Sequence, residues 1–143
     1  MDIKRRGSAH WSGGLKDGKG SVSTQSGALK ALPYGFGTRF EDGPGTNPEE
    51  LIGAAHAGCF TMALSSILGQ EGLTATALDT TAAVTLRQSA QGFEISAVHL
   101  TLEGKVPNTD AGTFQRLAQK AKENCPVSKL LKADITLDAK LVG

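Results

Sequence analysis

Alternation of hydrophobic and polar residues predicts β-strands near both ends of the chain and in its second half. Two glycine-containing turns separate neighbouring stretches, at residues 16–20 and 89–92. A segment rich in glycine and proline, residues 33–47, predicts a long irregular loop, which in a compact domain is more often functional than idle. The predicted extended stretches are residues 3–11, 21–24, 28–31, 80–86, 93–102 and 135–141.

The longest predicted helix covers residues 48–68 and carries no charge after its first turn. Two start signals overlap: Thr46 caps the helix with Glu49 closing a capping box, or Asn47 caps it with Pro48 at the first helical position. A helix without a polar face is buried on all sides. Because one short chain supplies little sheet to cover such a helix, we expect a homodimer that packs two of these helices together.

Two further helices are expected before the last strand. Phe114 and Leu117 recur at helical spacing in the first, which Thr109 or Asp110 caps, and a short helix follows over residues 125–131. The order is three strands, a helix, two strands, two helices and a strand. This order is typical of an α+β fold and not of a wound parallel sheet.

Length and charge narrow the function classes. A chain of 143 residues without an evident linker predicts one domain, residues 1–143. Fifteen basic against 14 acidic residues leave a net charge of +1, which argues against nucleic acid or an anionic membrane as the main partner. No apolar run approaches the ~20 residues that a membrane span needs, so no membrane-spanning segment is expected. The basic N-terminus has no apolar stretch behind it, which predicts a cytoplasmic protein.

The two cysteines, Cys59 and Cys125, lie far apart in the sequence. They form neither a Cys-x-x-Cys pair nor a zinc-ligand cluster, and the three histidines are scattered, so no metal site is expected. A static disulfide is not expected in a reducing cytosol. Two interpretations stay open: two buried free cysteines that act as small hydrophobes, or a redox pair that meets only in the fold.

The surroundings of the two cysteines suit different chemical roles. Cys59 lies mid-helix among apolar residues and needs a nearby cation to become a thiolate, whereas Cys125 precedes Pro126 at a helix start that favours one. This division suits a peroxidase, because an apolar pocket admits an organic hydroperoxide and a second thiol resolves the sulfenic acid. His56 lies about one turn before Cys59 and either tunes it or only packs.

Four segments carry a resemblance to a known family. Residues 46–60 (TNPEELIGAAHAGCF) and 125–128 (CPVS), together with residues 9–13 and 33–40, closely resemble the OsmC (osmotically inducible protein C) family over nearly the whole chain. The resemblance implies an OsmC-like fold, an intertwined homodimer with antiparallel sheets wrapped around central buried helices. It implies a cysteine-based peroxidase that reduces organic hydroperoxides to alcohols in oxidative and osmotic stress defence.

The resemblance also implies roles for four residues. Cys59 matches the family's peroxidatic cysteine, Cys125 its resolving cysteine, Glu49 its buried carboxylate and Arg39 its arginine. Arg39 would stabilise the Cys59 thiolate, and Glu49 would hold the guanidinium in a bidentate pair. No bound cofactor is implied, since the family uses an external dithiol, typically a lipoyl group on a protein.

Helix geometry adds a constraint, and other interpretations stay open. In one straight helix Glu49 lies about 15 Å along the axis from Cys59, so we expect the Glu49 near a given Cys59 to come from the other subunit, or Arg39 to bridge a long gap. Without the resemblance, Glu49 can equally be interpreted as a capping residue, and Arg39 as a solvated charge in a loop. The alternative functions are a redox sensor or binding module without turnover, and a structural stress protein.

Overall fold

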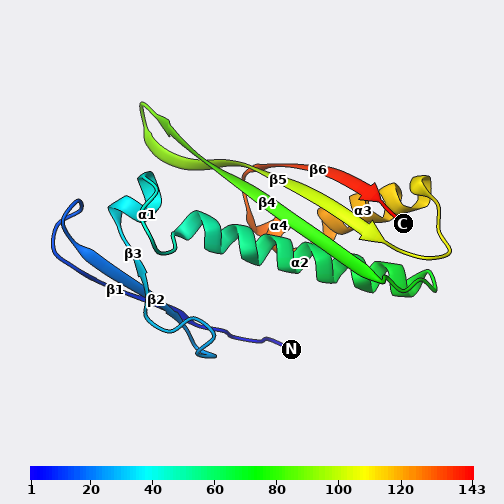
Figure 1. The fold of residues 1–143 in the computed structure, drawn as a ribbon, viewed down its shortest axis with the longest axis horizontal. Helices are drawn as coiled ribbons and strands as arrows, with labels where there is room; N and C mark the ends of the chain where they lie inside the picture. Colours follow the sequence, from blue (N-terminus) through cyan, green and yellow to red (C-terminus); the bar gives the residue numbers. More distant parts are fainter. The chain divides into compact units, whose positions relative to one another are not determined.

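The computed structural model describes all 143 residues. They divide into two compact units, Met1–Leu51 and Ile52–Gly143, each with its own three-stranded sheet. The expectation of one domain over residues 1–143 stays a prediction. In chain order (Figure 1) the elements are β1 (Gly7–Ser12), β2 (Lys19–Thr24), β3 (Leu32–Tyr34), α1 (Phe36–Phe40), α2 (Pro48–Gln70), β4 (Ala77–Ser89), β5 (Gly92–Lys105), α3 (Ala111–Asn124), α4 (Pro126–Leu130) and β6 (Asp134–Leu141).

The first unit contains an antiparallel sheet in the order β1-β2-β3. Trp11 of β1 and Tyr34 of β3 meet edge to face with their ring centroids 5.5 Å apart. The predicted loop over residues 33–47 is wrong in one respect, because it contains the short helix α1. The side chain of Thr38 bonds to both backbone groups of Gly35 at distances of 2.8 and 3.0 Å, which closes the first turn of this helix.

The start of α2 shows which of the two capping alternatives forms. Asn47 Oδ1 accepts a hydrogen bond of 2.8 Å from the backbone N–H of Glu50, and Pro48 occupies the first helical position. Asn47 Nδ2 also donates to the carbonyl of Thr38 at 3.0 Å, which ties the helix start to α1. Asn47 is therefore the cap, and the side chain of Glu49 is left for another partner.

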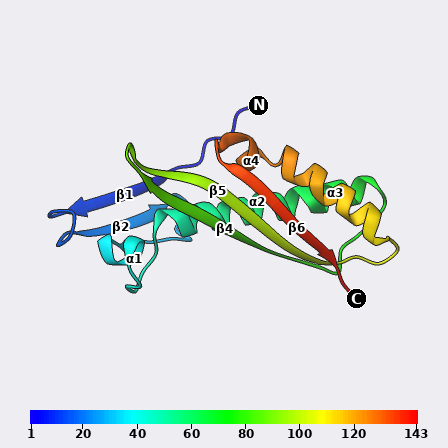
Figure 2. The same cartoon turned by 90° about the horizontal axis from the view of Figure 1, so that it is seen from above.

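The second unit has a sheet in the order β4-β5-β6, as Figure 2 shows from above. β4 and β5 form a long antiparallel hairpin with a bulge at Ser96, because Thr85 pairs with Ala97 and Leu86 with Ile95. The expectation of purely antiparallel sheets is corrected at β6, which runs parallel to β5. The helices α3 and α4 form the crossover that returns the chain to β5 at Ala97, which pairs with Asp134, and such a connection permits parallel pairing.

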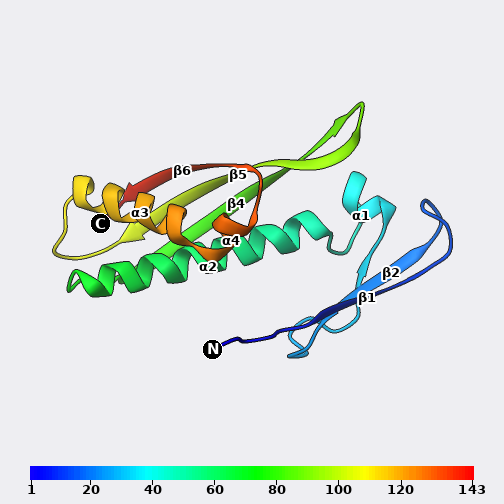
Figure 3. The ribbon, with the colours of Figure 1, turned by 180° about the vertical axis from the view of Figure 1, so that it is seen from behind.

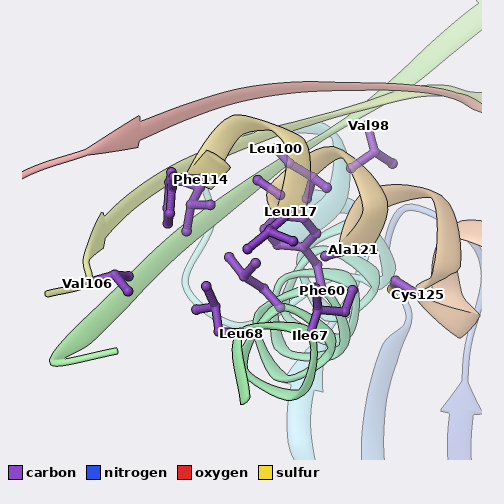
Figure 4. Packing of buried hydrophobic residues seen from close by; sticks show 13 residues of the cluster. Phe60, Ile67, Leu68, Val98, Leu100, Val106, Phe114, Leu117, Ala121 and Cys125 are labelled. Atoms are coloured by element: carbon purple, nitrogen blue, oxygen red, sulfur yellow. The ribbon is translucent and has the colours of Figure 1, made fainter. Parts of the chain in front are cut away.

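The core of the second unit lies between its sheet and the helices α2 and α3, which lie on the same side of the sheet (Figure 3). Figure 4 shows side chains from these helices meeting those of β5, with Cys125 at one edge of the cluster. Apolar burial of this extent is the main source of stability in a domain of this size. The fully buried members are Phe60, Leu64, Leu68, Val98, Leu100, Phe114, Leu117, Ala118, Ala121 and Cys125.

The expectation that the central helix is buried on all sides does not hold for a single chain. Its buried positions, among them His56, Phe60 and Leu64, follow helical spacing along one face, whereas Met62 is 77% exposed. By length and composition α2 is also apolar enough to cross a membrane, with 33% of its apolar window buried, which corrects the expectation from the sequence. This is weak evidence for a membrane, because core helices of soluble proteins share these properties.

Candidate active site

The first unit holds an ion pair between Arg39 of α1 and Glu49 in the first turn of α2. Arg39 Nε donates to Glu49 Oε1 at 2.9 Å and Nη2 donates to Oε2 at 3.0 Å, which is the predicted bidentate geometry. The Glu49 side chain is only 11% exposed and that of Arg39 is 36% exposed. A nearly buried carboxylate needs such a partner, and its place at a helix N-terminus stabilises it further. The pair thus fixes a guanidinium at the edge of the first unit's aromatic cluster.

An apolar cavity of about 290 Å³ lies beside this guanidinium. The rings of Phe36 and Phe40 lie 5.0 Å apart along its wall, and Arg39 Cζ lies 5.6 Å from the centre of the Phe40 ring. Trp11 and Tyr34 complete the aromatic lining. An aromatic wall with one cation suits a ligand that is apolar over most of its length and polar at one end.

The second unit brings the two cysteines together. Cys59, half-buried on α2, and Cys125, fully buried before α4, are both free thiols. The Cys59 thiol lies within hydrogen-bonding reach of the Cys125 thiol and of the backbone N–H of Val127. Of the two interpretations that the sequence left open, the structure therefore supports a pair that meets in the fold.

The environment of Cys59 in the single chain favours the protonated thiol. Burial is the largest cause that raises the pKa of Cys59, and the neighbouring Cys125 thiol raises it further, while the N–H of Val127 acts in the opposite direction. No cation is among these causes. A reactive thiolate at neutral pH therefore needs a positive group near Cys59.

A hydrogen bond between His56 and Ser128 lies one turn away from each cysteine, and the sequence did not predict it. His56 is fully buried, and its Nε2 lies 2.8 Å from Ser128 Oγ, while its Nδ1 has no partner. Burial lowers the pKa of His56, so the imidazole is neutral at pH 7. The only signal in the sequence is that His56 precedes Cys59 by three residues and Ser128 follows Cys125 by three.

The four residues implied by the resemblance thus form two half-sites. Arg39 and Glu49 belong to the unit Met1–Leu51, and Cys59 and Cys125 belong to the unit Ile52–Gly143. The structure pairs the members within each half-site. It contains no group of three or more His, Cys, Asp or Glu side chains placed to hold a metal ion.

Comparison with known proteins defines the class. The family profile described as OsmC-like protein matches residues 41–140. The chain is 58% identical over 141 residues to the peroxiredoxin OsmC of Escherichia coli (strain K12), covering 99% of both chains. It is 34% identical over 94 residues to the organic hydroperoxide resistance protein of Xanthomonas axonopodis pv. citri (strain 306), covering 65% of this chain and 64% of that one. The chain belongs to the OsmC-like protein family.

Solved structures agree on the fold. The organic hydroperoxide resistance protein OhrB of Bacillus subtilis superimposes with a TM-score of 0.74 at 24% identity, covering 98% of both chains. An OsmC-like protein of unknown function from Vibrio cholerae gives a TM-score of 0.78 at 15% identity, covering 96% of this chain and 99% of that one. These likenesses confirm the predicted α+β, OsmC-like fold.

Proposed function

We propose that this protein is a cysteine-based peroxidase that reduces organic hydroperoxides to alcohols in stress defence. The observation that carries the proposal is that two free thiols, distant in the sequence, lie within hydrogen-bonding reach of each other in a largely apolar setting. The names of the relatives support it, since one is called a peroxiredoxin and others organic hydroperoxide resistance proteins.

The first chemical step uses Cys59. Its thiolate attacks the terminal peroxide oxygen, the O–O bond breaks, and the alkoxide takes up a proton and leaves as the alcohol. The sulfur is oxidised to a sulfenic acid. We assign stabilisation of the thiolate to Arg39, held by Glu49, because the pKa of Cys59 in the single chain is raised and a fixed cation reverses that shift.

A partner subunit is the proposed source of that cation. Glu49 and Cys59 lie ten residues apart on the same helix, which places them about 15 Å apart along its axis. The exposed face of α2 supports a homodimer, because it presents Met62 and the small residues Ala54 and Gly58 without cover. Two such faces packed together would bury both helices.

The second step closes a disulfide. The Cys125 thiol attacks the sulfenic sulfur of Cys59, an S–S bond forms and water leaves, provided that the two Cα atoms lie within about 4.4–6.8 Å. An external dithiol, such as a lipoyl group on a protein, then reduces the bond by two exchange steps and leaves as a disulfide itself. The proposal includes no bound cofactor and no metal.

Steady-state turnover tests the proposal. Wild type, Cys59→Ser and Cys125→Ser are mixed with cumene hydroperoxide and dihydrolipoamide, and alcohol is measured over many equivalents. We expect repeated turnover in wild type, none in Cys59→Ser, and a single oxidation in Cys125→Ser. Consumption of one equivalent by wild type would instead support a redox sensor, and turnover by Cys59→Ser equal to wild type would refute the mechanism.

A further inference from the structure

The bond between His56 and Ser128 links the two segments that carry the cysteines. His56 belongs to α2, one turn before Cys59, and Ser128 belongs to α4, which begins directly after Cys125. The bond measures 2.8 Å and its donor and acceptor lie inside the second unit. It therefore crosses the same gap that a Cys59–Cys125 disulfide would cross.

The segment α4 has little else to hold it in place. It is five residues long and none of them is fully buried. Of its two apolar side chains after Pro126, Val127 is partly buried against the core, while Leu130 is 78% exposed. A short helix with so few apolar contacts is held weakly by packing, so a directional bond to a rigid neighbour has a large effect on its position.

The histidine has no other polar partner. Its Nδ1 is buried without a hydrogen bond, so Ser128 is the one group that satisfies the ring. Loss of the hydroxyl would leave a fully buried imidazole with two unpaired nitrogens, which is more costly than loss of an exposed bond. A buried polar group of this kind specifies one arrangement of the elements it joins.

We propose that His56 and Ser128 are a positioning pair that holds α4 against α2, so that Cys125 meets Cys59 and the disulfide closes. The inference rests on the disulfide of the proposed function. The pair acts on the exchange in which two thiols lose two protons and two electrons to an oxidant and form one S–S bond.

The test measures that bond without peroxide. Wild type, Ser128→Ala and His56→Leu are equilibrated with mixtures of reduced and oxidised dithiothreitol, quenched with acid, alkylated and analysed by mass spectrometry. The oxidised form of dithiothreitol accepts the two electrons and two protons. We expect both variants to need a ratio of oxidised to reduced dithiothreitol about tenfold higher for half formation of the disulfide, as loss of one buried hydrogen bond implies.

Conservative variants separate positioning from general damage. Ser128→Thr keeps a hydroxyl, and His56→Gln places an amide N–H where Nε2 lies. We expect both to stay within about twofold of wild type, since the directional bond is kept. If Ser128→Ala also stays there, or if Ser128→Thr falls as far as Ser128→Ala, the proposal is refuted. If His56→Leu fails to fold, as circular dichroism would show, the comparison of Ser128→Ala with Ser128→Thr still tests the proposal.

A second measurement separates this inference from the proposed function. With one equivalent of cumene hydroperoxide, Ser128→Ala should form the Cys59 sulfenic acid as fast as wild type and convert it to disulfide about tenfold more slowly. The trapped sulfenic acid is counted by mass spectrometry. If wild type does not react with peroxide at all, the proposed function fails, while the dithiothreitol equilibrium still accepts or rejects the positioning pair.

Discussion

The ion pair between Arg39 and Glu49 offers the sharpest perturbation, because Glu49→Gln removes one charge and keeps the shape. Two charge-assisted hydrogen bonds of 2.9 and 3.0 Å join the partners. Breaking a fully buried pair costs about 3–5 kcal/mol. The Arg39 side chain is 36% exposed and can recover part of its hydration, so we discount the loss to about 2 kcal/mol.

That free energy has two expected consequences. The midpoint of thermal unfolding should fall by about 6–7 °C, if the whole loss acts on the folded state. If Arg39 also stabilises the thiolate, the second-order rate of Cys59 oxidation by cumene hydroperoxide should fall by about tenfold to thirtyfold, measured by stopped flow. The rate should recover as pH rises, since a less stabilised thiolate forms at higher pH.

Glu50→Gln is the matched control. Glu50 is the next residue of the same helix turn, is exposed, and contributes only its backbone N–H to the Asn47 cap. We expect its unfolding midpoint within about 1 °C of wild type, as for an exposed surface change. Equal losses in Glu49→Gln and Glu50→Gln would refute the argument, because they would show that removal of negative charge from the helix start, and not the pair, sets both quantities.

Three further predictions concern the thiol, the assembly and the core. In Arg39→Met, the rate of Cys59 alkylation by iodoacetamide should rise with pH through a midpoint above the ordinary thiol range, because burial raises the pKa of Cys59. Wild type should show a lower midpoint. Equal midpoints in the two proteins would exclude Arg39 as the cation. Gly58→Trp should fold but sediment as a monomer, since a Cβ at Gly58 meets nothing within 4 Å in one chain yet would lie in the proposed interface; an unchanged sedimentation coefficient would contradict that interface. Gly104→Ala should lose about 1–3 kcal/mol of unfolding free energy in urea titration, because its Cβ would overlap the ring of a fully buried phenylalanine, whereas Gly69→Ala, with open space around it, should not be destabilised.

Much of the fold could be predicted because its elements carry strong local signals. The strands β4 and β6 alternate cleanly, and Pro48 after Asn47 marks the start of α2. The short helix α1 could not be predicted in the same way, since five residues with a glycine among them show no periodicity. The direction of β6 relative to β5 could not be predicted either, because the alternation of residues along a strand is the same in parallel and antiparallel pairing.

The residues of the site also differ in how far the sequence predicts them. Cys59 and Cys125 could be recognised as candidate reactive residues, and the resemblance indicated that Arg39 and Glu49 form a pair. The role of Ser128 could not be predicted, because a single serine near a cysteine is common and its role depends on a partner that is far away in the sequence. Residues that position a site act through contacts that tertiary structure creates, so local pattern cannot identify them.

The electrostatics of the two half-sites favour an enzyme that becomes reactive on assembly. In a single chain Cys59 is biased towards the thiol, and the guanidinium that would reverse this bias is held by Glu49 in the first turn of α2. The same helix leaves a face of small residues and Met62 uncovered. A dimer that brings Arg39 of the partner subunit to Cys59 would bury the uncovered face and supply the missing cation at the same time. Reactivity of the thiol would then depend on protein concentration, because a monomer that folds normally would keep a protonated and unreactive Cys59.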